Sequence, residues 1–93
     1  MGPLEIRANK NILKTGDNLE IKCSLPNIRG GQLISNRNFS WVKINGQLLS
    51  NVEPKGPVLK IGNLQLPNRG IYRCNLVTRH ETIFADYTID VKG

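Results

Sequence analysis

The two cysteines constrain the fold of this chain more than any other feature. Cys23 and Cys74 are 51 positions apart, which suits neither a four-ligand zinc site nor a Cys-x-x-Cys motif. A single disulfide is therefore expected, and closing a loop of about 50 residues stabilises a fold by roughly 4 kcal/mol in the chain-entropy model. The alternative is a pair of buried, reduced thiols in a cytosolic protein.

The length and composition fit one small domain. The chain has 93 residues, of which 39% are hydrophobic and only 5% aromatic, so aliphatic side chains must fill one core between two packed layers. We expect residues 1–93 to form a single domain. Met1-Gly2 looks like an expression start and Gly93 directly follows an expected strand, so we also expect this domain to be excised from a larger protein.

Short segments of alternating apolar and polar residues run through the chain, and none has a helical period. In the clearest segment, Leu19, Ile21 and Cys23 share one face. Together the segments predict about eight short strands in an antiparallel sandwich or a small barrel. Seven of these expected strands cover residues 4–8, 19–25, 39–44, 47–49, 58–61, 72–77 and 83–91.

Breaks in the alternation predict the turns and loops. Residues 26–38 have no sustained period and are expected to form a long exposed loop. Asn45-Gly46 favours a tight hairpin turn that leads into residues 47–49. Residues 50–57 contain Pro54, Gly56 and Pro57, and we expect them to interrupt the strands.

Four residues at particular spacings resemble the signature of the immunoglobulin fold over nearly the whole chain. Cys23 lies in an expected strand, Trp41 in a later one, and Cys74 follows Tyr72 by two positions. The segment Asn68-x-Gly70-x-Tyr72-x-Cys74 is similar to the family's Asp-x-Gly-x-Tyr-x-Cys, with Asn68 in place of Asp. The 33 positions from Trp41 to Cys74 leave little room for the extra strand pair of antibody variable domains. Within the family, the chain therefore most resembles the intermediate set, which is common in adhesion molecules, receptors and matrix proteins.

The resemblance implies an all-β, immunoglobulin-like antiparallel sandwich of two sheets with one inter-sheet disulfide, Cys23–Cys74. It implies that Trp41 packs against this bridge and that the Tyr72 hydroxyl bonds the backbone a few residues upstream. Asn68 carries no charge, so any ion pair that the family makes with the Asp is absent. The 18 positions from Cys23 to Trp41 are more than the family usually needs, so we expect residues 27–38 to form an expanded loop.

One Asn-x-Ser/Thr sequence occurs in the chain, Asn38-Phe39-Ser40. In a secreted protein it predicts an oligosaccharide on Asn38 at the end of the long loop. Chance matches to so short a pattern are common. The sequence adds modestly to the case for an extracellular location.

No set of residues suited to catalysis can be assembled from the sequence. His80 is the single histidine and is expected in a short hairpin loop, as a solvated residue with no partner for acid–base work. There is no phosphate-binding glycine loop and no cluster of metal ligands. We expect no enzymatic activity, no cofactor and no metal.

The net charge is +6, from 13 Lys and Arg against seven Asp and Glu. The basic residues are spread from Arg7 to Lys92 with no run of three. No expected strand interleaves aromatic with basic residues as a stacking platform would, which argues against nucleic acid. No apolar stretch of 18 residues exists, so direct membrane insertion is not expected. An alternative to simple solubilising charge is a patch for sulfated polysaccharide, formed by Arg29, Arg37, Arg69, Arg73 and Arg79.

The outward residues of the third, sixth and seventh strands are the expected site of protein contact. The family's topology would bring them together on one sheet face, where an exposed aromatic with valines and an arginine has the composition of a binding hot spot. The alternative is a surface of unconnected residues. The residues concerned are Val42, Arg73, Asn75, Val77 and Phe84.

The sequence therefore predicts a non-catalytic interaction module of an extracellular protein, such as an adhesion molecule, a receptor ectodomain or a basement-membrane proteoglycan. Its partner would be a protein. The alternatives are a spacer domain in a tandem array, a heparan sulfate-binding domain, and an intracellular muscle-type domain of the same fold with reduced cysteines.

Overall fold

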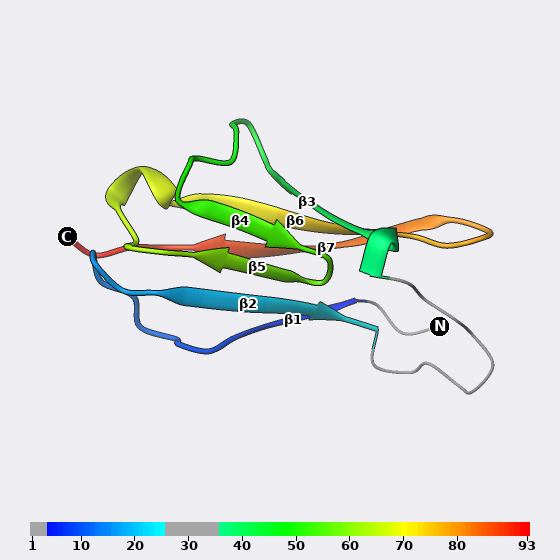
Figure 1. Cartoon of the computed structure of the whole chain (residues 1–93), viewed down its shortest axis with the longest axis horizontal. Coiled ribbons are helices and arrows are strands. Elements are labelled where there is room, and N and C mark those ends of the chain that lie inside the picture. Colours follow the sequence, from blue (N-terminus) through cyan, green and yellow to red (C-terminus); the bar gives the residue numbers. More distant parts are fainter. Residues whose placement is uncertain (1–3, 26–35) are drawn as a thin grey trace.

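The structure, a computed structural model, describes residues 4–25 and 36–93. These residues form seven strands and two short 3-10 helices (Figure 1). The strands are β1 (Glu5–Ala8), β2 (Leu19–Ser24), β3 (Phe39–Lys43), β4 (Val52–Lys55), β5 (Val58–Ile61), β6 (Gly70–Val77) and β7 (Thr82–Ile89). The 3-10 helices are η1 (Asn36–Asn38) and η2 (Leu66–Asn68).

The strands make two sheets, with the order β1-β2-β5-β4 in one and β3-β6-β7 in the other. All pairings between these strands are antiparallel. The sheets lie one in front of the other as two layers in the view of Figure 1. This arrangement is the immunoglobulin-like β-sandwich, and it confirms the fold class expected from the sequence.

The core lies between the two sheets because every long strand alternates. In β2 and β6 each second residue is buried, as a strand with one covered face requires. The Cys23–Cys74 disulfide joins β2 to β6 across this core. Trp41 is opposite Cys74 in the register of β3 and β6, and both are buried. The buried hydrophobic residues are Leu4, Leu13, Leu19, Ile21, Cys23, Trp41, Val52, Leu59, Ile61, Leu64, Tyr72, Cys74, Leu76, Ile89 and Val91.

The connection between β3 and β4 corrects two predictions. Asn45 has the expected turn conformation, with φ of 62°, but residues 47–49 form no strand. The chain instead crosses to the other sheet, where Val52–Lys55 is β4. Pro54 is tolerated because β4 is an edge strand and does not need every backbone donor. Gly56, with φ of 56°, makes the tight turn into β5.

Tyr72 and Trp41 each make one side-chain hydrogen bond to the backbone, and that of Tyr72 is the bond implied by the family resemblance. The Tyr72 hydroxyl donates to the Asn68 carbonyl oxygen at 2.7 Å, which fixes the corner before β6. The Trp41 indole donates from Nε1 to the Gly56 carbonyl oxygen at 3.1 Å. Because Trp41 belongs to β3 and Gly56 to the β4–β5 turn, this bond ties the two sheets together.

Candidate binding face

The outward residues of β3, β6 and β7 form one continuous surface, which we call the front face. The register aligns them in rows across the three strands. One row joins Val42, Arg73 and Asp86, and the next joins Ser40, Asn75 and Phe84. The front face consists of Ser40, Val42, Ile71, Arg73, Asn75, Val77, Thr82, Phe84, Asp86 and Thr88.

An ion pair and an aromatic ring occupy the centre of the front face. Arg73 donates from Nε to Asp86 Oδ1 at 2.8 Å and from Nη2 to Asp86 Oδ2 at 3.1 Å. Its guanidinium carbon lies 4.0 Å from the centre of the Phe84 ring. The two hydrogen bonds to Asp86 and the contact with the Phe84 ring together hold the Arg73 guanidinium in one orientation.

The same contacts shift the ionisation of both charged groups. The hydrogen bonds from Arg73 lower the pKa of Asp86 below its ordinary value. The hydrogen bonds to Asp86 raise the pKa of Arg73. Both groups stay charged at neutral pH, and their charges cancel at the centre of the face.

Large apolar side chains surround this centre. Val42, Ile71, Val77 and Phe84 are 44%, 40%, 49% and 53% exposed. They account for four of the seven exposed large hydrophobic residues in the part of the chain that the structure describes. Single exposed apolar residues need no explanation, but a group around an arginine and an aromatic ring has the composition of a contact surface.

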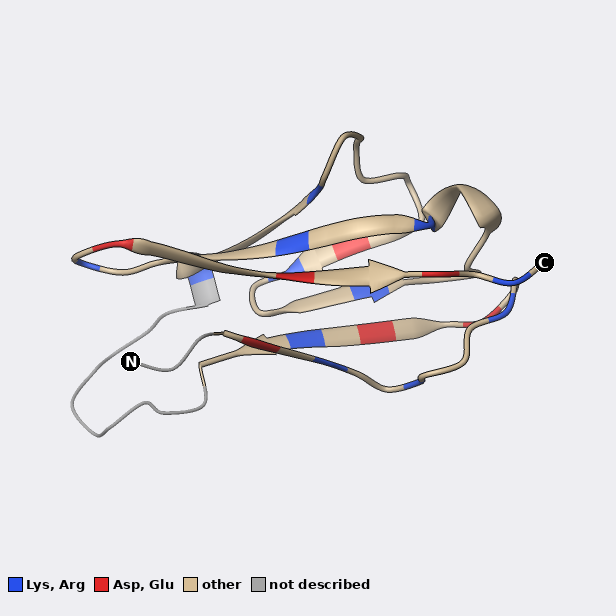
Figure 2. Cartoon of the chain, turned by 180° about the vertical axis from the view of Figure 1, so that it is seen from behind, with Lys and Arg blue, Asp and Glu red and all other residues tan. Residues whose placement is uncertain are grey.

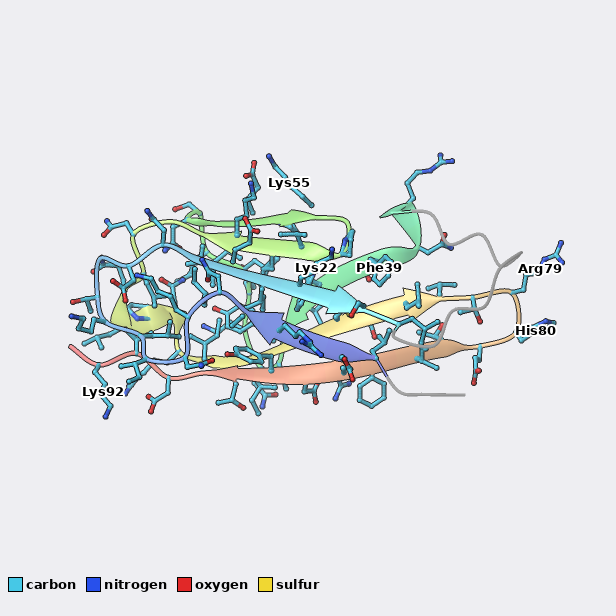
Figure 3. The ribbon with its side chains drawn as sticks, turned by 90° about the horizontal axis from the view of Figure 1, so that it is seen from below. Lys22, Phe39, Lys55, Arg79, His80 and Lys92 are labelled. Atoms are coloured by element: carbon cyan, nitrogen blue, oxygen red, sulfur yellow. A yellow bond between two sulfur atoms is a disulfide. The ribbon has the colours of Figure 1, made fainter. Side chains whose placement is uncertain are left out.

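The outward face of the other sheet, which we call the back face, has the opposite character. Charged residues alternate on it and form the ion pairs Lys60–Glu20, Arg7–Glu5 and Lys55–Glu53 at 3.7, 3.5 and 3.5 Å. Lys22 and Lys55 are marked on this sheet in Figure 3. Exposed, paired charges of this kind are typical of a surface that stays solvated. The charged residues of the back face are Glu5, Arg7, Glu20, Lys22, Glu53, Lys55 and Lys60.

The arginines proposed as an anion patch are not gathered at one place. Arg69 directly precedes β6 and Arg79 follows it, so an eight-residue strand of about 25 Å separates them. Arg37 belongs to η1, next to the end of β6 where Arg79 lies. Arg29 is outside the described residues. Figure 2 shows lysines and arginines distributed over both ends and both sheets, so Arg37, Arg69 and Arg79 do not make a single patch.

Asn38 lies at the end of the front face. Its Nδ2 donates to the Val77 carbonyl oxygen at 2.9 Å, which places the side chain beside the last residue of β6. Whether Asn38 carries an oligosaccharide stays a prediction, and most of the long loop that precedes it lies outside the described residues.

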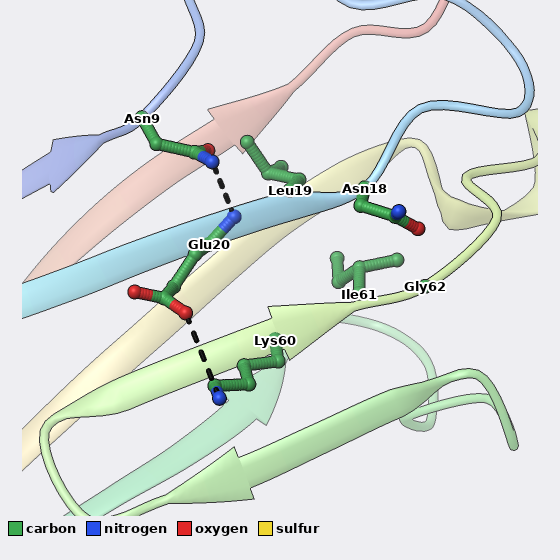
Figure 4. A pocket seen from close by; sticks show the side chains of 7 residues that line it. All are labelled: Asn9, Asn18, Leu19, Glu20, Lys60, Ile61 and Gly62. Carbon is green, nitrogen blue, oxygen red and sulfur yellow. Dashed lines mark hydrogen bonds and ion pairs between the residues drawn. The ribbon is translucent and has the colours of Figure 1, made fainter.

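A shallow, open hollow of about 260 Å³ lies where β2 and β5 meet the turn after β1 (Figure 4). Its polar groups bond one another. Asn9 Oδ1 accepts from the Glu20 backbone N–H at 2.9 Å, and Asn18 Oδ1 accepts from that of Asn63 at 3.0 Å. The hollow therefore offers a ligand few polar atoms that lack a hydrogen-bond partner. Its lining residues are Asn9, Asn18, Leu19, Glu20, Lys60, Ile61 and Gly62.

Residues 4–25 and 36–93 contain no group of three or more His, Cys, Asp or Glu residues placed to hold a metal ion. His80 lies at the tip of the β6–β7 hairpin (Figure 3), and its backbone N–H donates to Thr78 Oγ1 at 3.3 Å. The described helices are too short and polar to cross a membrane.

The sequence prediction did not single out the other five residues of the front face, which are Ser40, Ile71, Thr82, Asp86 and Thr88. Ile71 continues the outward alternation of Arg73 by two positions, so extending the period would have found it. Asp86 shares the outward period of Phe84, but its pairing with Arg73 depends on the register between β6 and β7. No local signal in the sequence gives that register.

Comparisons with known proteins agree with this fold. No protein-family model matches the chain. Cell adhesion molecule 4 of Xenopus laevis is 25% identical over 87 residues, which cover 92% of this chain and 21% of that protein. The chain thus spans about a fifth of the length of this relative.

Solved structures are similar over nearly the whole chain. The crystallised ectodomain of mouse nectin-like molecule 4 superposes with a TM-score of 0.82 at 22% identity, over 96% of this chain and 29% of that one. Murine CEACAM1b superposes with a TM-score of 0.71 at 16% identity, over 98% of this chain and 45% of that one. The chain therefore has the fold of immunoglobulin-like ectodomains.

Proposed function

We propose that this chain is a non-catalytic, adhesion-type recognition module of an extracellular protein, and that it binds a protein partner through the front face. One observation carries the proposal: the front face gathers four exposed large hydrophobic residues around a fixed arginine, whereas the back face is covered with paired charges. Solubility alone does not require exposed apolar residues to gather on one face, whereas a protein-binding site does.

The composition of the front face suits contact with a protein. Interface centres are depleted in unpaired charge and enriched in aromatic residues and arginine. Phe84 and Arg73 supply these two residue types in direct contact. Because Arg73 is already held by Asp86, little side-chain entropy is lost when a partner covers it.

The extracellular location rests on the disulfide and on the relatives. A Cys23–Cys74 bridge persists in oxidising compartments and is rare in the cytosol. The similar proteins include a cell adhesion molecule and an ectodomain. The rival, an intracellular muscle-type domain, requires reduced Cys23 and Cys74, which thiol labelling of native protein would detect.

We also assign the domain to the intermediate set. The direct passage from β3 to β4, with no added strand pair between them among the described residues, argues against a variable-type domain. The strand order itself is shared with seven-stranded constant-type domains.

The test is binding of the fluorescently labelled, multimerised domain to cultured animal cells, measured by flow cytometry. The proposal predicts binding that trypsin treatment of the cells abolishes and heparinase treatment leaves in place. Loss after heparinase alone would replace the protein partner with a sulfated polysaccharide. No binding to any cell type, together with no aggregation of domain-coated beads, would favour the spacer.

A further inference from the structure

We propose that Asn38 carries an N-linked oligosaccharide that bounds the Val77 end of the front face and so restricts which part of it a partner can cover. The inference rests on the proposed extracellular function, because it requires passage through the secretory pathway. It adds a modification site and a regulatory role to that function.

The geometry places the attachment atom at the sheet. Asn38 is the last residue of η1 and directly precedes β3, an edge strand. Phe39 pairs with Leu76, so Asn38 comes next to Val77 in the same register. The hydrogen bond from Asn38 Nδ2 to the Val77 carbonyl oxygen holds this nitrogen at the end of β6. The first sugar must therefore start there.

The sequence supplies the other residue that the modification needs. Ser40 is the hydroxyl residue of the acceptor sequence, and it is exposed in β3 opposite Asn75. The donor is an oligosaccharide linked through a pyrophosphate to a membrane lipid. A bond forms between Asn38 Nδ2 and C1 of the first sugar, the bond from C1 to the pyrophosphate oxygen breaks, and the lipid pyrophosphate leaves with the proton lost by Nδ2.

The modified side chain can keep its place in the fold. A primary amide nitrogen carries two hydrogens, and glycosylation consumes one of them. The remaining N–H is sufficient for the bond to Val77. The oligosaccharide therefore adds bulk without breaking the contact that positions it.

The position of the sugar determines its effect on binding. Val77 and Thr82 form the row nearest to Asn38, and the row with Asn75 and Phe84 follows about 7 Å further along the strands. Ile71 and Thr88 form the most distant row, six residues away along β6. A bulky, hydrated sugar covers the near rows and leaves Ile71 and Val42 open.

The first test asks whether the site is used. The chain secreted from cultured animal cells is compared with Ser40→Ala, which removes the acceptor sequence but keeps Asn38, and with Ser40→Thr, which preserves it. Asn11→Gln, at an exposed position outside any acceptor sequence, is the matched control. We expect a mass shift, removable by peptide N-glycosidase, in all forms except Ser40→Ala. A folded, secreted wild-type chain without this shift overturns the inference.

The second test locates the sugar. Two-dimensional NMR spectra are recorded for the chain trimmed enzymatically to a single N-acetylglucosamine and for the unglycosylated chain produced in bacteria, which keeps the Asn38 amide. We expect shift changes at Val77, Thr82 and Phe84 and none at Ile71 and Thr88. Changes confined to residues outside the front face overturn the proposed regulation.

The third test measures the regulation itself and separates it from the proposed function. The unglycosylated wild-type chain, produced in bacteria with its disulfide formed, should bind trypsin-sensitive sites on cells several-fold more tightly than the glycosylated wild-type chain. Equal binding by the two forms overturns the inference and leaves the binding face standing. Unchanged binding by Phe84→Ala in the unglycosylated chain instead overturns the binding face.

Discussion

Asn68 lies in the turn before β6 and is fully buried. Its Oδ1 accepts hydrogen bonds from Asn51 Nδ2 at 2.8 Å and from the Gln65 backbone N–H at 2.9 Å, and its Nδ2 donates to Asn51 Oδ1 at 3.1 Å. The two amides thus bond each other reciprocally. This neutral pair stands where the family's Asp would be, so the departure from the family motif has its own local solution.

We predict that Asn68→Asp destabilises the domain. A carboxylate at this position has no hydrogen to give to Asn51 Oδ1, and leaving a buried polar group unmatched costs about 1–3 kcal/mol. The free energy of unfolding, measured with denaturant at pH 7, should fall by this amount. Asn11→Asp adds the same charge at an exposed position and should change it little. Equal effects of the two variants would contradict the role of the pair.

Asp86 gives a prediction about pH. Hydrogen bonds from Arg73 lower its pKa in the folded state, so the pair contributes stability above the unfolded Asp value of about 3.9. That contribution is lost as the pH falls through the lower, folded value. The NMR titration of the Asp86 carboxyl should therefore have its midpoint below the ordinary Asp range. A midpoint at or above that range would contradict the pairing.

At the level of strands, the alternation of apolar and polar residues predicted most of the fold. Period two identifies which residues share a face, so the core side of β2 and β6 and the outward set Val42, Arg73 and Phe84 could be read from the sequence. It could not give β4, because Pro54 and Gly56 looked like interruptions. Only the neighbouring strand β5, which pairs with Val52–Lys55, makes this segment a strand.

The inter-sheet bridge gives a prediction about the packing of the strands. Cys74→Ser removes the link between β2 and β6 and should lower the free energy of unfolding by about 2–5 kcal/mol. Thermal and denaturant unfolding under oxidising conditions measure this loss. Adding a reductant should destabilise the wild type but not the variant. An unchanged melting temperature in the variant would show that the bridge contributes nothing.

Seen as a whole, the molecule has one face covered with charged residues and one face on which exposed apolar residues surround an ion pair. Its net charge of +6 is not concentrated at either end. We therefore predict that binding through the front face depends only weakly on salt. The one ion pair of the face is internal, so the face offers a partner no unpaired charge whose attraction salt could screen. Half-saturation on cells should change little between low and high salt. A steep loss with added salt would point to the dispersed basic residues instead.

The central claim is that the front face binds a protein, and its most direct test is the affinity of face variants for trypsin-sensitive sites on cells. Phe84→Ala and Arg73→Ala should each weaken half-saturation by tenfold or more with folding intact, as expected when a hot-spot residue worth about 2 kcal/mol is truncated. Ile12→Ala, an apolar residue 78% exposed outside the front face, and Lys22→Ala, on the back face, should bind as the wild type does. Unchanged affinity in both front-face variants would contradict the claim.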